Sequence, residues 1–133
     1  MAIALCPEDQ MISIREISER TQISDNYLEQ IFTLLKKGDI IASTRGASGG
    51  YRLARPASRI FVGDVLRAAE KSLSPVLCVE DMSVCAKSTQ CTARNAWSRL
   101  YRAISDSVNQ ISISDLVNEF HNESVSAASD YTI

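Results

Sequence analysis

The sequence contains no hydrophobic run long enough to cross a membrane, and it contains neither internal repeats nor low-complexity blocks. A membrane-spanning helix needs about 20 predominantly apolar residues in succession. The apolar opening, residues 1–6, is too short for a signal peptide and has no basic segment before it. These absences predict a cytoplasmic protein without a membrane partner, and 133 residues correspond to about one domain.

Histidine is almost missing as well, because His121 is the only one in the chain. No Cys/His pair is close in sequence, as an activated cysteine nucleophile would require, and no phosphate- or nucleotide-binding loop is present. We therefore predict that the protein is not an enzyme.

The chain has four cysteines, and three of them lie in one segment without helical or strand periodicity, residues 72–91. In a reducing compartment such cysteines favour metal or redox chemistry over structural disulfides. Cys78, Cys85 and Cys91 have the spacing C-x6-C-x5-C. Thiolates are the usual ligands of iron–sulfur clusters. Zinc ranks second because it prefers tighter C-x2-C pairs, and the absence of any metal is the third possibility.

The fourth cysteine, Cys6, lies among apolar residues at the start of the chain. We expect this segment to belong to a first helix. There Cys6 should be a small buried hydrophobic residue.

The net charge of −2 conceals an uneven distribution of charge. Residues 36–59 contain six basic side chains and one acidic side chain, whereas residues 72–133 contain four basic and seven acidic side chains. This asymmetry predicts a basic face that contacts nucleic acid, attached to a neutral or acidic second module. A solvated charged surface is the alternative interpretation.

Two short helices joined by a brief link are predicted near the start of the chain. The sequence Ser-x-x-Glu beginning at Ser13 is a capping box for a helix over about 14–20. Ser24 is the candidate N-cap of the second helix, and Gly38 follows that helix as a C-terminal stop. This is the helix-turn-helix pattern.

A β-hairpin is predicted directly after these helices, with strands at 40–44 and 51–54 and a glycine-rich tip between them. A further helix is predicted over 62–70. A helix-turn-helix followed by a hairpin with basic residues at its tip is a winged helix. The sequence therefore predicts a fold that is mainly α with a small β-hairpin.

In a winged helix-turn-helix the second helix enters the major groove of DNA. Asn and Gln side chains can pair with adenine there, and Glu can accept a hydrogen bond from cytosine. Glycines in the wing allow close backbone approach to phosphates, and an arginine at its base can enter a narrow minor groove. The predicted DNA-binding residues are Ser24, Asn26, Tyr27, Glu29, Gln30, Lys36, Arg45, Ser48, Gly49, Gly50 and Arg52.

A long helix is predicted over 92–109, followed by a short helix that ends at Phe120. A stripe of apolar residues along the long helix has near-heptad spacing, which suits a helix that packs on a partner helix. We therefore predict a homodimer, although the core of a single chain would produce the same stripe. Residues 122–133 are small and polar and are expected to be disordered. The stripe of apolar residues consists of Ala93, Trp97, Leu100, Ile104, Val108 and Ile111.

The sequence thus divides into four parts. Residues 1–71 form the winged helix-turn-helix, 72–91 the cysteine-bearing sensor loop, 92–121 the dimerisation helices, and 122–133 the tail.

Several motifs together resemble the IscR/NsrR family of bacterial winged-helix transcription regulators. They are Tyr27-Leu28-Glu29-Gln30-Ile31-Phe32, the wing from Thr44 to Ala54, Val62-Gly63-Asp64-Val65, the three cysteines, and Ile113-Ser114-Asp115-Leu116-Val117. The resemblance implies a homodimer built on the long helix and promoter DNA as the ligand. It also implies that the three cysteines often hold an iron–sulfur cluster, and that Glu29, Gln30 and Arg45 read DNA.

The sequence departs from this family in two places. Members usually begin with a basic Ser/Thr-Lys-Gly-Arg-Tyr segment, so we expect the start of this chain to be truncated or misassigned. Some cluster-binding members have a histidine three residues after the last cysteine, where this chain has Arg94. An arginine is always charged and cannot replace an imidazole ligand. The fourth position is then left to another residue, a small molecule or nothing stable, and His121 is too distant along the chain to substitute.

We predict a DNA-binding transcription regulator whose promoter binding is controlled by an iron–sulfur cluster or by the redox state of the three-cysteine loop. One alternative is a regulator of the same fold without metal, controlled by thiol oxidation or by a partner protein. A winged-helix module that binds other proteins is a further alternative, and it would lack salt-dependent DNA binding.

Overall fold

The computed structural model describes residues 1–7, 10–46, 49–70 and 72–129. Its architecture is mainly helical with a two-stranded antiparallel hairpin, so the predicted fold class is confirmed. Four short 3-10 turns, η1 to η4, are added to the helices and strands. In chain order the elements are α1 (Ile14–Thr21), α2 (Asp25–Lys37), β1 (Ile41–Thr44), β2 (Gly50–Leu53), η1 (Ala57–Arg59), α3 (Val62–Ala69), η2 (Leu77–Val79), η3 (Met82–Val84), η4 (Ser88–Gln90), α4 (Thr92–Gln110) and α5 (Ile113–Ser129).

The hairpin pairs β1 with β2 in a register that places Ile41 opposite Leu53. The segment before α1 adds a third, short line of pairing, because Ile12 and Tyr51 exchange both backbone hydrogen bonds at 3.1 and 2.9 Å. Gly50 lies so close to this segment that a Cβ atom there would be 2.8 Å from the carbonyl oxygen of Ile12. A glycine is therefore required at the start of β2 for steric reasons.

The hydrophobic core joins the winged helix to the beginning of α5. Ile12 and Ile60 are almost completely buried at its centre, at 1% and 0% exposure. Truncation of such a side chain to alanine typically costs about 2–5 kcal/mol. The buried apolar residues are Ile12, Ile17, Leu28, Phe32, Leu35, Ile40, Ile41, Ile60 and Ile113.

Residues 1–6 form turns instead of the helix that the sequence predicted. Pro7 follows directly, and a proline disfavours helical backbone in the residue before it. The segment still packs against the core, and the half-buried Cys6 donates a hydrogen bond from its thiol to the carbonyl of Ala2 at 3.5 Å. Cys6 is thus a small packing residue, although it is neither helical nor fully buried.

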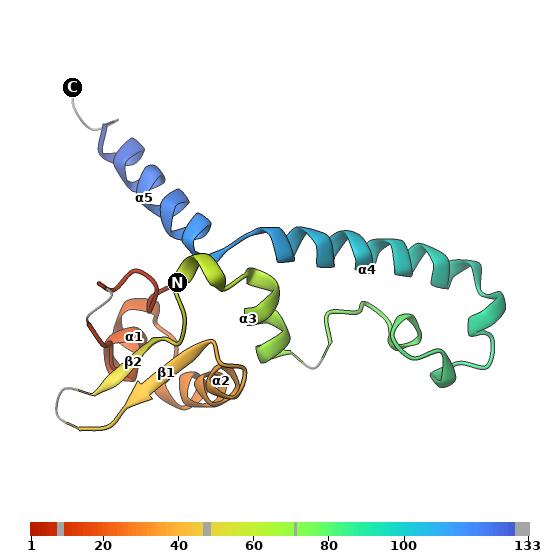
Figure 1. Ribbon diagram of the computed structural model, residues 1–133, viewed down its shortest axis with the longest axis horizontal. Coiled ribbons are helices and arrows are strands. Elements are labelled where there is room, and N and C mark those ends of the chain that lie inside the picture. Colours follow the sequence, from red (N-terminus) through yellow and green to blue (C-terminus); the bar gives the residue numbers. More distant parts are fainter. Residues whose placement is uncertain (8–9, 47–48, 71, 130–133) are drawn as a thin grey trace.

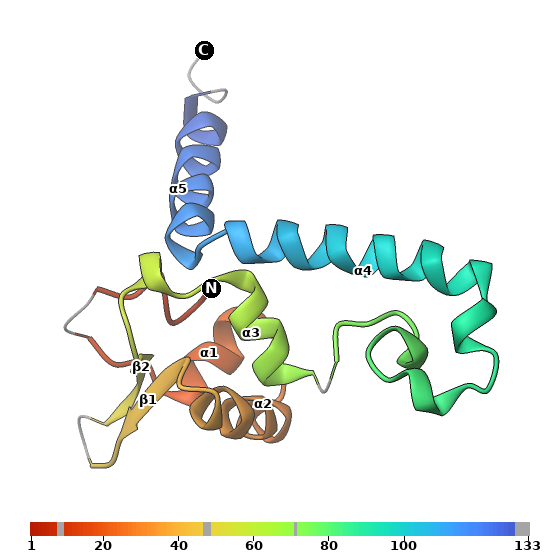
Figure 2. The ribbon, with the colours of Figure 1, turned by 45° about the vertical axis from the view of Figure 1, so that its right-hand side comes forward.

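The long helix α4 projects away from the winged helix, and α5 leaves the same junction in another direction (Figures 1 and 2). The junction is a short antiparallel bridge between Phe61 and Ser112. Two backbone hydrogen bonds close it, from Val62 N–H to the Ile111 carbonyl at 2.9 Å and from Ile113 N–H to the Ile60 carbonyl at 2.8 Å.

Charged side chains surround this junction. Asp64 accepts a hydrogen bond from the Phe61 N–H at 3.1 Å and pairs with Arg67 at 3.2 Å and with Arg55 at 3.6 Å. Arg67 also donates to the side chain of Asn109 on α4 at 2.8 Å. The Phe61 amide, followed by the hydrogen bond from Arg67 and the charges of both arginines, lowers the pKa of Asp64 below its ordinary value. Asp64 is therefore ionised at neutral pH and, through Arg67, connects Arg55 to Asn109 at the end of α4.

The last helix differs from its prediction. Ser112 and Asp115 cap its start as expected, with the Asp115 carboxylate accepting from the Ser112 N–H at 2.8 Å. However, α5 continues to Ser129 and does not end at Phe120. Residues 122–129, which were expected to be disordered, are helical, because each added residue of a helix gains a further backbone hydrogen bond. The remaining tail, 130–133, lies outside the described residues. None of the described helices is long and apolar enough to span a membrane.

Candidate nucleic-acid interface

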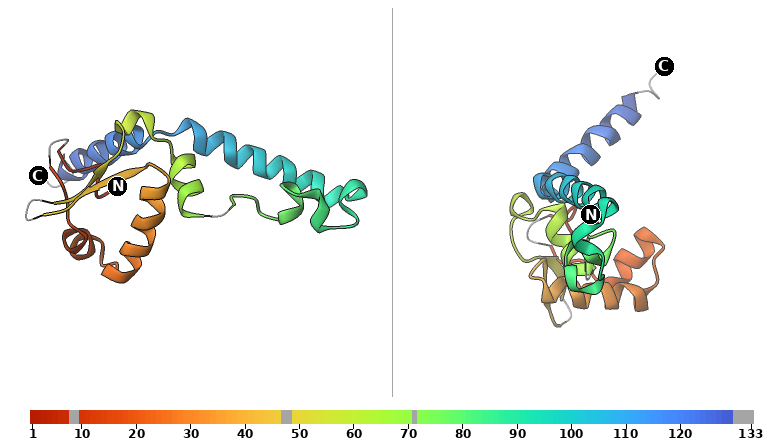
Figure 3. Two further views of the ribbon diagram at one scale, coloured as in Figure 1. Left: turned by 60° about the horizontal axis from the view of Figure 1, so that its bottom comes forward. Right: turned by 90° about the vertical axis from the view of Figure 1, so that its right-hand side faces the viewer.

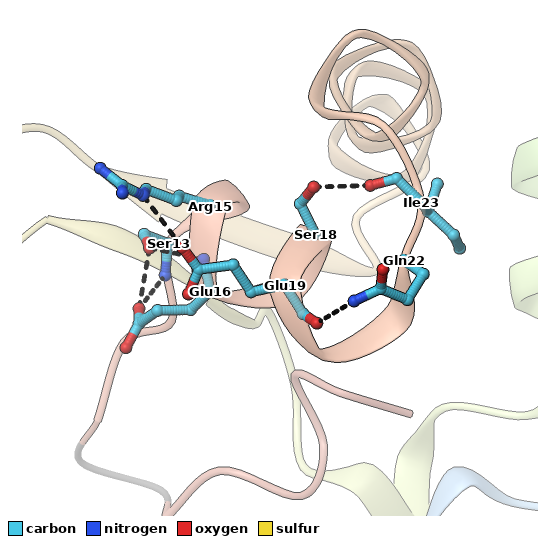
Figure 4. A network of polar contacts seen from close by, with 7 residues as sticks. All are labelled: Ser13, Arg15, Glu16, Ser18, Glu19, Gln22 and Ile23. Carbon is cyan, nitrogen blue, oxygen red and sulfur yellow. Dashed lines mark hydrogen bonds and ion pairs between the residues drawn. The ribbon is translucent and has the colours of Figure 1, made fainter.

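The turn between α1 and α2 fixes how the second helix of the pair is presented (Figure 4). Gln22 takes a left-handed backbone conformation, φ 59°, and its side-chain amide donates to the Glu19 carbonyl at 2.8 Å. The Ser18 hydroxyl donates across the turn to the Ile23 carbonyl at 2.7 Å. These hydrogen bonds fasten the turn residues Gln22 and Ile23 to the end of α1, directly before α2 begins at Asp25.

The capping box at Ser13 forms as predicted. The Glu16 carboxylate accepts from the Ser13 N–H at 2.9 Å, and the Ser13 hydroxyl accepts from the Glu16 N–H at 3.2 Å. The Ser13 backbone amide, and after it the Ser13 side chain, lowers the pKa of Glu16. Ser24 stands at the N-cap of α2, but its side chain makes no cap hydrogen bond in the described structure.

Helix α2 buries one face and presents the other to solvent. Leu28, Phe32 and Leu35 are the buried residues. Leu34 is 42% exposed, whereas the ring of Phe32 is buried with its centroid 4.7 Å from that of Tyr51 on β2. The exposed residues at the start and middle of α2 include the predicted DNA-reading residues Asn26, Tyr27, Glu29 and Gln30.

Basic side chains follow this exposed face. Lys36 and Lys37 are exposed in the last turn of α2, Arg45 is exposed directly after β1, and Arg52 is exposed on β2. In both ribbon views α2 and the hairpin lie together, on the part of the module turned away from α4 and α5 (Figures 1 and 2). Arg55 belongs to the same basic run of residues 36–59, but its guanidinium pairs with Asp64 at the junction, so we do not include it in this surface.

The wing tip uses glycine where the backbone requires it. Gly46 has φ +121°, a conformation that is strained for residues with a Cβ atom. The N–H of Gly49 donates to the Gly46 carbonyl at 3.0 Å, and a Cβ at Gly49 would collide with the Thr44 carbonyl. Ser48, also predicted to contact DNA, lies outside the described residues.

The cysteine-bearing loop lies at the other end of the molecule, beside the start of α4 (Figure 3). Cys78 and Cys91 are half-buried, Cys85 is exposed, and all four cysteines are free thiols. Among the described residues, no group of three or more His, Cys, Asp or Glu side chains is placed to hold a metal ion. Three thiolates are a suitable donor set for an iron–sulfur cluster, but this conformation of the loop does not bring them together as ligands.

Arg94 and His121, the two residues considered for the fourth ligand position, are engaged elsewhere. The Nε of Arg94 donates to the Cys78 carbonyl at 2.7 Å. His121 is on α5, where its ring lies 6.0 Å from that of Phe120.

Sequence reasoning missed the side-chain network at the junction. Arg67 and Asn109, which meet there, are 42 positions apart. The contact between Tyr101 of α4 and Glu80 of the cysteine loop, 21 positions apart, was missed as well. The one local signal was Asp64, which stands three residues after Phe61 as an acidic capping residue does.

Comparison with known proteins places the chain among transcription regulators. The model of the Rrf2 family, described as an iron-dependent transcriptional regulator, matches residues 1–119. The protein Rrf2 of Nitratidesulfovibrio vulgaris is 38% identical over 117 residues, which are 88% of this chain and 78% of that protein. The HTH-type transcriptional regulator IscR of Yersinia pseudotuberculosis is 38% identical over 116 residues, which are 87% of this chain and 70% of that protein.

Solved structures resemble the whole architecture. CymR (YrzC), the global cysteine regulator of B. subtilis, superposes with a TM-score of 0.71 at 28% identity, covering 89% of this chain and 86% of that one. IscR of T. potens gives the same TM-score at 29% identity, covering 89% of this chain and 77% of its own.

The surface formed by α2 and the wing generates a prediction about two kinds of contact. With a duplex selected from random sequences, we expect Arg45→Ala to weaken binding by about 1–3 kcal/mol and to relax the sequence preference at the bases it reads. Lys36→Ala should weaken all duplexes alike and reduce the slope of log K against log salt by about 1.

Titrations at several salt concentrations measure both effects. Arg102→Ala, which removes an equal charge from α4, is the matched control and should behave like the wild type. Unchanged affinity and preference in Arg45→Ala would remove the wing arginine from the interface.

Proposed function

Because the chain belongs to the Rrf2 family of transcription regulators, whose model matches residues 1–119, we propose that it binds promoter DNA as a homodimer and that its three-cysteine loop controls this binding. The resemblance to the IscR/NsrR family seen in the sequence is confirmed, and the chain is a DNA-binding transcription regulator and not an enzyme. The quaternary structure, the individual contacts and the signal are the parts that we propose.

The exposed polar face of α2 beside the arginine-bearing wing is the observation that carries the DNA-binding mode. Asn26, Glu29 and Gln30 are exposed in the first half of the helix, which is the half that reaches base edges in a helix-turn-helix complex. Lys36 and Lys37 at the far end are placed for phosphates, and Arg45 for the minor groove.

The apolar stripe of α4 supports the homodimer. On this 19-residue helix, Trp97 is 41% exposed and Leu100 is 44% exposed in the isolated chain. Burial of a fully exposed large apolar side chain contributes about 1.5–3 kcal/mol, and these two side chains would contribute the share that is still exposed, so a second copy of α4 laid along the stripe would stabilise the pair. Two copies would also present two recognition helices, which matches the way dimers read paired half-sites on DNA.

Control by the cysteines is supported by their chemistry and their position. Cys78, Cys85 and Cys91 are the donors that a cluster would use, yet the described conformation does not gather them. Any ligand that binds all three thiols must therefore rearrange the loop at the start of α4. An iron–sulfur cluster and a thiol-oxidation switch are the two forms of this control, and zinc is a third possible occupant.

The homodimer predicts the behaviour of a charged variant. Ile104→Glu places a carboxylate in the proposed seam, and we expect a monomer that keeps the helical content of the wild type. Sedimentation velocity with far-UV circular dichroism measures both properties.

Glu119→Gln on α5 provides a control that alters charge away from the stripe, and it should remain dimeric. An intact Ile104→Glu dimer would show that another surface joins the subunits.

The cysteine loop predicts a difference in iron content. After anaerobic reconstitution with iron and sulfide, wild-type protein should bind iron and absorb visible light, and the Cys78, Cys85, Cys91→Ser triple variant should not. Cys6→Ser is the control and should resemble the wild type, since Cys6 packs on the core.

If wild-type and triple-variant proteins bind equally negligible iron, the cluster form of control is wrong. DNA binding before and after mild thiol oxidation then decides whether the redox form replaces it.

A further inference from the structure

The part of the cysteine loop that carries Cys78 is fastened to α4 at two points. Arg94, in the first turn of α4, donates from Nε to the Cys78 carbonyl at 2.7 Å. Further along the helix, the Tyr101 hydroxyl contacts the Glu80 carboxylate at 3.1 Å. The Ser72 hydroxyl donates to the other oxygen of the same carboxylate at 2.7 Å. The η2 turn is thus held along the side of α4.

The part that carries Cys85 is built differently. The Asp81 carboxylate accepts from the Ser83 N–H at 2.8 Å, and the Ser88 hydroxyl donates to the Met82 carbonyl at 2.7 Å. Residues 82–90 are called the Cys85 lobe below. The hydrogen bonds that the structure describes for them join these residues to one another and to Asp81, and none reaches α4. Cys85 is the exposed cysteine of the three.

Arg94 is suited to a holding role by its chemistry and its place. A guanidinium is charged at every physiological pH, so its hydrogen bond to a carbonyl does not depend on protonation. Cys91 is the N-cap of α4, and Arg94 follows it by three residues. The first turn of one helix therefore positions Cys91 through the chain and Cys78 through the hydrogen bond.

We propose that Arg94 and Tyr101 are positioning residues that tether the Cys78 segment to α4 and leave the Cys85 lobe untethered. Given thiol control of DNA binding, on which this consequence rests, a change at the cysteines acts on α4 through this tether. Arg94 then has a function of its own in this chain: together with Tyr101 it connects the Cys78 segment to the side of the helix.

Thiol accessibility tests the tether directly. The full-length protein is treated with iodoacetamide at one pH, and peptide mass spectrometry follows the alkylation of each cysteine with time. In Arg94→Gln we expect Cys78 to react about tenfold faster, the change that losing one ordinary hydrogen bond produces in a local opening equilibrium. Cys85 should keep its rate, because its lobe is not held by Arg94.

Two further variants make the result specific. Arg99→Gln removes the same charge from an exposed position on the same helix and should leave all rates as in the wild type. Tyr101→Phe removes a single hydroxyl and should accelerate Cys78 to a smaller degree. Wild-type rates at Cys78 in both Arg94→Gln and Tyr101→Phe, or equal acceleration of Cys78 and Cys85, would overturn the tether.

The consequence for DNA is measured separately. For each protein, the affinity for the duplex selected from random sequences is determined in the reduced state and after oxidation with diamide. The ratio of the two affinities should fall close to one in Arg94→Gln and stay at the wild-type value in Arg99→Gln. A wild-type ratio of one would refute thiol control, while the alkylation rates would still decide the tether. If the ratio in Arg94→Gln is as large as in the wild type, the tether does not connect the cysteines to DNA binding, and this part of the proposal is wrong.

Discussion

The backbone bridge between Phe61 and Ser112 is the constraint on which the remaining architecture depends. Its two hydrogen bonds attach α4 and α5 to the winged helix, and Ile60 and Ile113 on either side of it are both in the core. Burial of two such side chains contributes several kcal/mol, whereas a partly exposed ion pair such as Arg55–Asp64 contributes at most about 1 kcal/mol. The apolar contacts therefore hold the junction together, and the charged network around Asp64 selects its orientation.

Because of this junction, the direction of α4 is fixed relative to the winged helix. Asn109 at the end of α4 meets Arg67 of α3. Next to Arg67 on α3, Gly38 lets the end of α2 approach Ala68 so closely that a Cβ atom at Gly38 would lie 2.6 Å from the alanine side chain. A rotation of α4 would therefore disturb the support of α2, the helix with the exposed polar face. In a dimer joined through α4, the same geometry would determine the separation of the two recognition helices, and under the proposed control a change in the cysteine loop would act on DNA binding by this route.

The sequence predicted the parts of the fold that local rules govern. The Ser13 capping box, the glycine stop at Gly38 and the glycine-rich tip between the two wing strands act within a few residues, and they placed α1, α2 and the hairpin to within one or two positions. Composition was a poorer guide at both ends of the chain: residues 1–6 form turns ahead of Pro7, and the small polar residues after Phe120 continue α5. The junction network could not be predicted, because Arg67 and Asn109 meet only after the chain has folded. The cysteines were identified as a group by spacing, but spacing carries no information on the contact between Arg94 and Cys78.

Amide hydrogen exchange at the junction tests most directly whether α4 and the winged helix form one mechanical unit. The informative protons are the Val62 and Ile113 amides, which close the bridge, and the Tyr51 amide, which lies inside the winged helix. If the junction is as firm as the core, all three exchange through the same global opening and at rates within about a factor of ten of one another. Exchange of Val62 and Ile113 more than about a hundredfold faster than that of Tyr51 would show a hinge that opens independently, and would contradict a fixed connection between α4 and the DNA-reading surface.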